Sequence, residues 1–493
     1  MHQSEQIAVV HTRQHDHSKQ CESRELPVQS QPMWKVLVVL VALIVAAVVV
    51  WVKAGNAPGP AIEITGPAVI GRTGEIAVSV VAPKAALKRL EITLAQDPTV
   101  APVFSLTHDN ASELTVAGDR VSITRPSGKN VVPELKQGSA EIRVTAVRPV
   151  LFGLREASAT VKRGVDVRLL PPQIAVVSSF HYVNHGGSEA VVYRVTPPDA
   201  QSGVRVGNYE YPGFPASGAG VASADPALRV AFFALLWDQD ERNTPIRVYA
   251  RDSVGNESSG SFDYRIFPKQ FRSSRIELDD AFLAKVVPPI VQNSPELKVD
   301  DPSDLLASFL KINRDLRKMN NETITKLAAQ TSPEILWRGP FKQLLNTAVE
   351  AGFADQRTYL YKGKEVDRQV HLGFDLASLA GAPVKAANRG RVLHAGWLGI
   401  YGNCVILDHG MGLMSLYAHL SSIEVQVGDM VELDKEIGRS GSTGLAGGDH
   451  LHFTMLLAGN AVTPIDWWSA QWVQDRVTRK LVDAGAPPSS AAR

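Results

Sequence analysis

The chain has few cysteines and no excess of charge of either sign. Its two cysteines, Cys21 and Cys404, are too few for a framework of disulfide bonds. The formal net charge of +1, with no basic stripe, argues against nucleic acid as a partner. Cys404 precedes the apolar run 405–407 and is expected to be a small buried core residue. With 493 residues the chain is too long for one core, so several folded units are expected.

Long apolar runs are absent, with one exception near the N-terminus. Every residue from 36 to 52 is apolar, and Trp34 and Trp51 lie at the two ends of this run. The length is near the short end of what spans a bilayer as a helix, and tryptophan suits both membrane interfaces. We therefore predict a transmembrane signal anchor at 34–53. The alternative is a cleaved signal peptide, which would fit better if translation began at Met33.

Basic residues are distributed unequally about the apolar run. Only Lys53 follows it closely, whereas four precede it: Arg13, Lys19, Arg24 and Lys35. The positive-inside rule then predicts a single pass through the cytoplasmic (inner) membrane with the N-terminus inside. Residues 1–33 are predicted to be a disordered cytoplasmic tail. The rest of the chain is expected outside this membrane, in the periplasm or the extracellular space.

Long helical patterns are missing between residues 58 and 269. Apolar residues instead alternate with polar or small ones, as in 76–80 and 140–144, and turn-forming residues interrupt them at short intervals. This alternation predicts half-buried strands, and many short strands with frequent turns favour β-sandwiches over a βαβ fold. We expect two sandwich modules, at 58–170 and 171–269.

The second module ends in a hairpin pattern. Residues 246–257 run from a predicted strand through Asp252 and a Gly-Asn turn to a second strand, which resembles the closing hairpin of a bacterial immunoglobulin-like domain. His181 and His185 lie near a predicted turn and are expected to be surface-loop residues. Neither module contains a catalytic constellation. We therefore expect both to be spacers, or to bind a protein partner.

After residue 269 the apolar pattern changes to helical spacing. Asp301-Pro302-Ser303-Asp304 is a helix start signal, with Ser303 or Asp304 as N-cap. Apolar residues then recur at helical spacing as far as Met319, and a second short helix is predicted at 323–330. We expect 270–336 to be a helical connector that packs on a neighbouring domain. The alternative is a segment that plugs the functional site of the last unit until it is displaced.

The last unit, at 337–470, is rich in glycine and in short β-branched segments. This composition predicts a compact antiparallel β-fold, and 471–493 are expected to be a C-terminal tail. The predicted fold class is therefore mainly β: a transmembrane helix, two immunoglobulin-like sandwich modules, a short helical connector and an antiparallel β-domain.

Five residues of the last unit could form a metal site. His371 and Asp375 are four residues apart across a Gly-containing turn, and His419 lies further along the chain. His450 and His452 would lie on one face of a strand, because side chains alternate along a strand. Histidine and aspartate are suitable donors to zinc, and a catalytic zinc needs three protein ligands and an open position. The five residues can supply such a set and leave two histidines for acid–base work.

The motifs of this unit resemble those of the lysostaphin-type (LytM-like) zinc metallopeptidases, which cut peptide bonds in peptidoglycan. The match keeps residue order over about the last quarter of the chain and lies in residues 371–375, 381–384, 401–403, 417–420, 427–429, 436–438, 440–444 and 450–453. The resemblance implies that His371, Asp375 and His452 are the zinc ligands. It also implies that His419 and His450 are the catalytic pair that positions and deprotonates the nucleophilic water. No His-Glu-x-x-His motif is present, so histidine must act as the base.

Departures from the family pattern are modest. Asp449 lies where proline is frequent, and Thr454 lies where an acidic residue is common, but neither change removes a ligand. His394 and His409 match no ligand position and are expected to be structural or surface residues. Three side chains just upstream are candidates for contact with substrate: Arg357, and Tyr359 or Tyr361.

The sequence thus predicts a membrane-anchored zinc endopeptidase that hydrolyses the peptide crosslinks of peptidoglycan. The alternative is a non-catalytic wall-binding protein that activates another cell-wall hydrolase. Such a protein is expected to have lost ligands, whereas this chain keeps all three and both catalytic histidines. An adhesin or scaffold built on the β-modules would leave the C-terminal motifs unexplained. The predicted partners are peptidoglycan peptides, the membrane and a protein that binds the β-modules.

Overall fold

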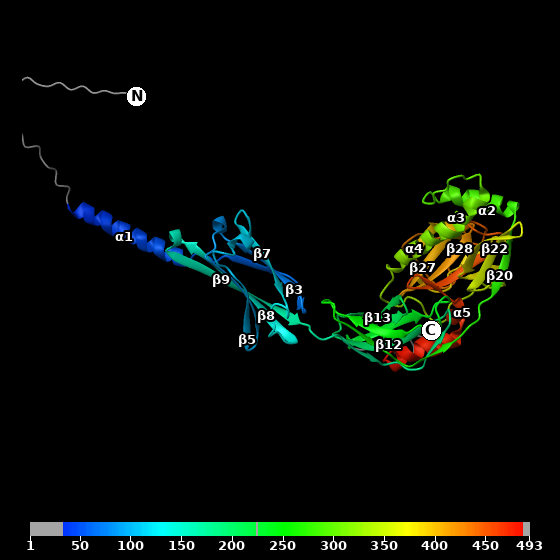
Figure 1. Ribbon diagram of the computed structural model, residues 1–493, viewed down its shortest axis with the longest axis horizontal. Helices are drawn as coiled ribbons and strands as arrows, with labels where there is room; N and C mark the ends of the chain where they lie inside the picture. The colour runs from blue at the N-terminus through cyan, green and yellow to red at the C-terminus, as the bar shows by residue number, and fades with distance from the viewer. Residues whose placement is uncertain (1–32, 223–224, 487–493) are drawn as a thin grey trace, which may run out of the picture.

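The computed structural model describes residues 33–222 and 225–486, in which β-strands are more abundant than helices (Figure 1). A single helix leads to one β-module, a second β-module follows, and the chain ends in a larger β-unit bordered by helices. The predicted mainly β architecture with an N-terminal apolar helix is confirmed. The predicted tail at 1–33 lies outside the described residues except for Met33.

Helix α1 (Met33–Gly55) contains the apolar run. Its most apolar 18-residue window has a mean hydropathy of 3.0, and none of that window is buried against the rest of the protein. A helix in a soluble core would bury at least one face. Length and composition therefore suit a single-pass membrane anchor or a signal sequence.

The first module packs two sheets on each other. Strand order is β1-β3-β7-β6 in one sheet and β2-β9-β8-β4-β5 in the other. The strands are β1 (Ala61–Thr65), β2 (Val69–Ile70), β3 (Gly74–Val81), β4 (Arg89–Gln96), β5 (Thr99–Ser105), β6 (Thr115–Ala117), β7 (Arg120–Ser127), β8 (Gly138–Val150) and β9 (Arg155–Val167). Alternate residues such as Ile76, Val78 and Val80 enter the shared core, as the period of two predicts. The long β8–β9 hairpin extends along the module toward α1 (Figure 1).

The second module also has two main sheets, ordered β10-β12-β16-β15 and β14-β13-β17-β18, and a two-stranded sheet of β11 and β19. The strands are β10 (Gln173–Val176), β11 (His181–Asn184), β12 (Ser188–Thr196), β13 (Gln201–Val206), β14 (Tyr209–Pro212), β15 (Phe214–Pro215), β16 (Leu228–Ala234), β17 (Ile246–Arg251), β18 (Glu257–Gly260) and β19 (Tyr264–Phe267). The predicted hairpin forms between β17 and β18, and Asp252 accepts the backbone N–H groups of Val254 and Asn256 in its turn. The immunoglobulin-like resemblance stays a prediction.

His181 and His185 are both buried, so their prediction as surface-loop residues is wrong. His181 Nδ1 donates to the Asp263 carbonyl at 2.9 Å, and the ring of His185 packs edge-on against Phe271. The cause is the parallel pairing of β11 with β19, which are about 80 residues apart in the chain. A local turn signal does not predict such a distant partner.

The 270–336 segment is joined to the last unit by a strand. β20 (Ser273–Leu278) pairs in parallel with β22 (Asp355–Tyr361), and β23 (Lys364–His371) completes this sheet. Three α-helices follow β20: α2 (Asp280–Asn293), α3 (Leu305–Lys311) and α4 (Arg317–Ala328). A π-helical stretch at 312–316 joins α3 and α4 into one continuous helix, so the separate helix predicted at 323–330 is the end of α4. The predicted N-cap is confirmed, since Asp304 accepts the backbone N–H of Ala307 at 2.9 Å.

The last unit is built on an antiparallel sheet. The order is β21-β24-β32-β28-β27-β26-β30, and β33 pairs with β32. These strands are β21 (Ala348–Ala351), β24 (Phe374–Ala377), β26 (Gly390–Trp397), β27 (Asn403–Gly410), β28 (Leu413–Leu420), β30 (Met430–Val431), β32 (Leu451–Leu457) and β33 (Asn460–Val462). A smaller sheet contains β25 (Pro383–Lys385), β31 (Glu436–Arg439) and β29 (Ser422–Ile423). Cys404 is fully buried beneath α4, as predicted.

Residues 471–486, the last that the structure describes, are mainly helical rather than a tail. The helices from residue 464 onward are α5 (Pro464–Trp468), α6 (Ala470–Trp472) and α7 (Arg479–Asp483), with a π-helical stretch at 473–478. Lys480 Nζ lies 2.8 Å from Glu189 Oε1 on β12, and both side chains are buried. Figure 1 shows this red segment against the second module. The tail prediction therefore fails for the described residues 471–486, because their partner lies in a distant part of the sequence.

The second module and the last unit share one hydrophobic core. Trp467 of α5 packs edge-on against Phe232 of β16, and its Nε1 donates to Ser188 Oγ at 3.2 Å. Asp466 accepts the backbone N–H of Ser188 at 3.0 Å and the side-chain amide of Asn184 at 2.8 Å. These contacts hold the sheet of the last unit firmly against the second module.

Candidate metal centre

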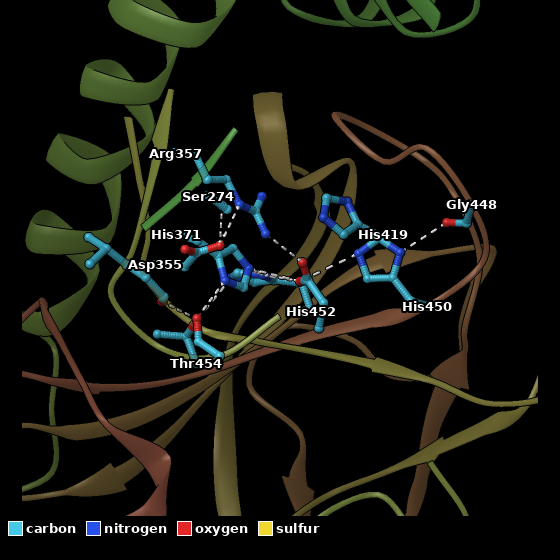
Figure 2. Close-up of polar contacts among 12 residues, drawn as sticks. Ser274, Asp355, Arg357, His371, His419, Gly448, His450, His452 and Thr454 are labelled. Atoms are coloured by element: carbon cyan, nitrogen blue, oxygen red, sulfur yellow. Dashed lines mark hydrogen bonds and ion pairs between the residues drawn. The ribbon is translucent and has the colours of Figure 1, made fainter. Parts of the chain in front are cut away.

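Three side chains of the last unit converge on one another, and Figure 2 labels two of them, His371 and His452. His371 ends β23, Asp375 lies on β24, and His452 is directly opposite Asp375 on β32. Asp375 Oδ1 lies 2.9 Å from His371 Nε2 and 2.9 Å from His452 Nδ1, and these two nitrogens are 3.0 Å apart. All three residues are buried. The strand register thus brings together donors from two motifs about 80 residues apart.

The other nitrogen of each imidazole is already hydrogen-bonded. His371 Nδ1 donates to the Gly352 carbonyl at 3.0 Å. Thr454 Oγ1 donates to the Leu372 carbonyl at 2.7 Å, so it accepts from His452 Nε2 at 3.0 Å. In the neutral imidazoles, His371 Nε2 and His452 Nδ1 therefore each carry a lone pair and no proton. With Asp375 ionised, no hydrogen lies between these three atoms to form a hydrogen bond. A single cation satisfies this donor set, and two imidazoles with one carboxylate suit zinc.

Asp375 is kept ionised by its neighbours. Burial raises its pKa, but when the imidazoles are protonated, the hydrogen bond and charge of His371, with further bonds from His450 and His452, outweigh burial and hold the pKa well below its usual value. Arg357 Nη2 lies 3.2 Å from the second oxygen, Oδ2. Arg357 thus binds Oδ2 of Asp375, while Oδ1 remains directed at His371 and His452.

His419 and His450 lie beside the three converging donors. His419 Nδ1 donates to the Thr443 carbonyl at 2.8 Å, and His450 Nδ1 donates to the Gly448 carbonyl at 3.0 Å, so each ring keeps Nε2 for other contacts. The two ring centres are 4.9 Å apart. Burial lowers the pKa of His419 to about 3. Burial also lowers the pKa of His450, but the nearby Asp375 more than offsets this and the pKa is raised.

The backbone around these residues is locally constrained. His419 has a left-handed φ of 62°, which is uncommon for a residue with a side chain and frequent at functional sites. Gly373 lies in the turn between His371 and Asp375, and a Cβ there would be 2.5 Å from both His452 Cε1 and Thr454 Oγ1. Glycine is therefore required for the close approach of this turn to the His452 ring.

The histidines face a cavity of about 310 Å³. Phe282 of α2 and Phe309 of α3 line it together with Tyr359, so the connector forms part of the wall. Tyr361, the other tyrosine predicted as a substrate contact, instead donates its hydroxyl to Asp280 Oδ1 at 2.6 Å. The sequence pattern gave no sign that the connector would border the site.

The structure brings all five predicted site residues to this cavity: His371, Asp375, His419, His450 and His452. His394 and His409 lie elsewhere. His409 is buried, and its Nδ1 donates to the Arg389 carbonyl at 2.8 Å while Nε2 accepts from Ser415 Oγ at 2.7 Å. Sequence reasoning missed the orienting role of Thr454, although its departure from the family pattern was the available signal.

A family model described as Peptidase family M23 matches residues 369–464. That range holds all five of these side chains and the strands that position them. The C-terminal unit is a Peptidase family M23 domain. The predicted resemblance to lysostaphin-type peptidases is therefore confirmed.

Several known proteins are similar to this M23 domain. The DD-carboxypeptidase/endopeptidase Mpg of Neisseria meningitidis serogroup B is 39% identical over 97 residues, which are 20% of this chain and 22% of that protein. The murein hydrolase activator EnvC of Escherichia coli K12 is 40% identical over 95 residues, 19% of this chain and 23% of that protein. The solved catalytic domain of the antimicrobial peptidase lysostaphin from Staphylococcus simulans is 30% identical, with 25% of this chain and 92% of that chain covered and a TM-score of 0.22. The chain spans about a fifth of the length of the curated relatives it matches.

Proposed function

We propose that this protein is a zinc-dependent endopeptidase that hydrolyses peptide crosslinks of peptidoglycan outside the cytoplasmic membrane. The observation that carries the proposal is the convergence of His371 Nε2, His452 Nδ1 and Asp375 Oδ1 within 3.0 Å of one another, with no proton between them. The likeness to a protein named as a DD-carboxypeptidase/endopeptidase supports a peptide substrate.

In the proposed mechanism, three residues bind the metal ion and two histidines act on the nucleophile. His371, Asp375 and His452 would hold zinc, which would supply Lewis acidity to the scissile carbonyl and to water. His419 accepts the proton of the nucleophile at Nε2, because its Nδ1 is held by the Thr443 carbonyl, and returns the proton to the leaving amine. His450, whose ring centre lies 4.9 Å from that of His419, positions the nucleophile.

The proposed location follows from α1. We propose that α1 is a single-pass anchor with the N-terminus in the cytoplasm and the M23 domain in the periplasm or extracellular space. The apolar run, its flanking tryptophans and the basic residues ahead of it support this orientation. The two β-modules then act as spacers or as a surface for a protein partner.

A second candidate function is activation of another cell-wall hydrolase by a non-catalytic wall-binding protein. The likeness to the murein hydrolase activator EnvC supports it. The presence of three converging donors and two further histidines in one cavity favours the enzyme instead.

The test is digestion of purified peptidoglycan by the full chain in detergent, with zinc content measured on the same samples. We expect zinc to copurify and crosslinked peptides to be released. His419→Ala should keep zinc and lose cleavage, whereas His394→Ala, outside the cavity, should behave as wild type. Undiminished cleavage by His419→Ala would refute the assigned mechanism. A zinc-loaded protein that releases no peptide but stimulates an added cell-wall hydrolase would establish the activator function.

A further inference from the structure

The β8–β9 hairpin ends in an exposed apolar tip. Phe152 is 103% exposed and Leu154 is 70% exposed, with Leu151 beside them. Large contiguous apolar groups on a surface mark contact sites for partners or membranes. Turns of soluble hairpins generally use Gly, Asn or Asp instead.

The backbone conformation of the hairpin tip would be more favourable for Gly, Asn or Asp than for large apolar residues. Leu151, Phe152 and Gly153 have φ values of 50°, 55° and 91°, in the left-handed region that is costly for leucine and phenylalanine. Local folding therefore does not explain why positions 151 and 152 carry large apolar side chains. A contact between these side chains and a partner outside the protein would explain them.

The tip lies beside the end of α1. Arg155, the first residue of β9, donates from Nη1 to the Trp51 carbonyl at 2.8 Å, and its guanidinium lies 4.8 Å from the centre of the Trp51 ring. The same guanidinium lies against Gly55, the last residue of the helix. Figure 1 shows the hairpin reaching this end of α1. Tryptophan at the end of a membrane span lies at the level of the lipid headgroups.

The direction of the hairpin follows from the chain after α1. Trp51 lies beside Arg155, and Gly59, further from the membrane, lies against Ser158. β9 therefore runs away from the membrane as residue numbers increase. The tip at 151–154 precedes Arg155, so it projects to the membrane side of Trp51, alongside the apolar part of α1.

Basic side chains surround this junction. Arg155 contacts the end of α1, Lys53 lies within its last turn, and Arg148 of β8 donates to the Pro58 carbonyl at 2.8 Å. An apolar tip with basic residues behind it suits the interface of an anionic phospholipid bilayer. Acyl chains accept the apolar groups, and headgroup phosphates accept the arginine and lysine side chains.

We propose that the β8–β9 tip, with Leu151, Phe152 and Leu154, inserts into the outer surface of the bilayer that α1 spans. This inference rests on the proposed membrane anchor. A single helix leaves the first module able to tilt about the anchor, whereas a second contact beside the helix fixes its orientation. The hairpin thereby sets the direction in which the following units extend from the membrane.

The experiment uses the full chain in vesicles of phosphatidylcholine and phosphatidylglycerol. Cys21→Ser removes the reactive cysteine outside the described residues, and Cys404 is fully buried. Phe152→Cys or Leu154→Cys is then labelled with an environment-sensitive fluorophore and quenched with lipids that carry a spin label on the acyl chain. The matched control is Val100→Cys on β5 of the same module, an exposed apolar position at 58%. Val45→Cys in α1 reports insertion of the anchor.

We expect labels at 152 and 154 to shift to shorter emission wavelength and to lose most of their emission, while the label at 100 loses none. Quenching at 45 with none at 152 and 154 would leave the anchor intact and overturn the hairpin contact. No quenching at 45 would overturn the anchor and the hairpin contact together. A shift to shorter emission wavelength at 152 that appears only after another membrane protein is added, without quenching by the spin-labelled lipids, would also overturn it, since the occupant would then be protein.

Discussion

Replacement of Lys480 by methionine should destabilise the junction between the second module and the M23 domain. The ammonium of Lys480 is 5% exposed and lies 2.8 Å from Glu189 Oε1, which is 0% exposed. Lys480 also donates to the Ala190 carbonyl at 2.8 Å. Methionine keeps most of the apolar stem and removes the charge, so the variant isolates the ion pair.

The size of the effect follows from what remains around Glu189. Loss of one partner of a buried ion pair costs about 3–5 kcal/mol, because the other charge stays buried without compensation. Two backbone N–H groups, of Tyr182 and Ala190, still donate to the carboxylate, each at 2.8 Å. We therefore expect the lower end of the range, about 3 kcal/mol.

The measurement is denaturant unfolding followed by tryptophan fluorescence, since Trp467 and Trp472 lie in the affected core. Burial raises the pKa of Glu189, and loss of Lys480 removes the main opposing charge. The folded state of Lys480→Met then binds a proton more tightly than the unfolded state does. Its stability must fall as pH rises above the unfolded glutamate pKa of about 4.3, with a steeper slope than in wild type.

Two results would refute this reasoning. One is a loss below about 1 kcal/mol, the value of an exposed pair. The other is a pH slope equal to that of wild type. The control is the double variant Glu189→Gln/Lys480→Met, which removes both charges and should recover part of the lost stability.

Three further predictions concern the M23 domain. Arg357→Met should weaken zinc binding by about 10–100-fold in equilibrium dialysis, because Asp375 Oδ2 loses the donor that orients it, and equal affinity would contradict this. Zinc at a hundredfold excess over its dissociation constant should stabilise the wild type by about 2.7 kcal/mol in thermal unfolding, and Asp375→Ala should lose this gain. Burial lowers the pKa of His409 to about 4, so its neutral state should contribute about 3 kcal/mol that is complete above pH ~6.5 and lost as pH falls toward 4. His409→Gln should flatten that pH dependence, and an unchanged profile would exclude His409 as its source.

The grouping of the five candidate residues could be predicted because their motifs are local and carry their own strand pattern. His450 and His452 alternate on one strand, and Gly373 marks the turn after His371, so each motif implies its own geometry. Their convergence also needs the pairing of β24 with β32 and of β28 with β32, whereas the family resemblance supplied only the roles of the residues.

Features that depend on distant partners could not be predicted in this way. The helical segment around Lys480 packs Val473, Val477 and Leu481 into the shared core. Lys480 itself pairs with the buried Glu189, about 290 residues earlier in the chain. His181 is buried by a parallel strand from the far end of its module. Strand β20 within the connector was also not predicted from the sequence. Its partner β22 is parallel to it, so the two strands are not joined by a short hairpin turn that the sequence could reveal.

The pairing of β20 decides how a plugging role of the connector can be tested. Ser274 on β20 donates to Asp355 Oδ2 at 2.7 Å, and Arg357, two residues along β22, contacts Asp375. Removal of 270–336 would expose this strand edge and loosen the arginine. Activity would then fall even if α2 and α3 block the cavity. Truncation therefore cannot separate the gain from opening the cavity from the loss caused by a loosened Arg357.

Substitutions in α2 can separate the opening of the cavity from the loosening of Arg357, because such substitutions leave β20 in place. The cavity of about 310 Å³ is at the small end of ligand sites, whereas a crosslinked peptide is extended, so α2 must move if it covers the path of the substrate. Lys285 Nζ donates to the Gly447 carbonyl at 2.7 Å, which ties α2 to the loop that carries His450. If the connector is a plug, Lys285→Met and Phe282→Ala should each raise the rate of peptidoglycan cleavage at unchanged zinc content. Equal or lower rates in both variants would show that α2 forms a wall of the substrate site instead.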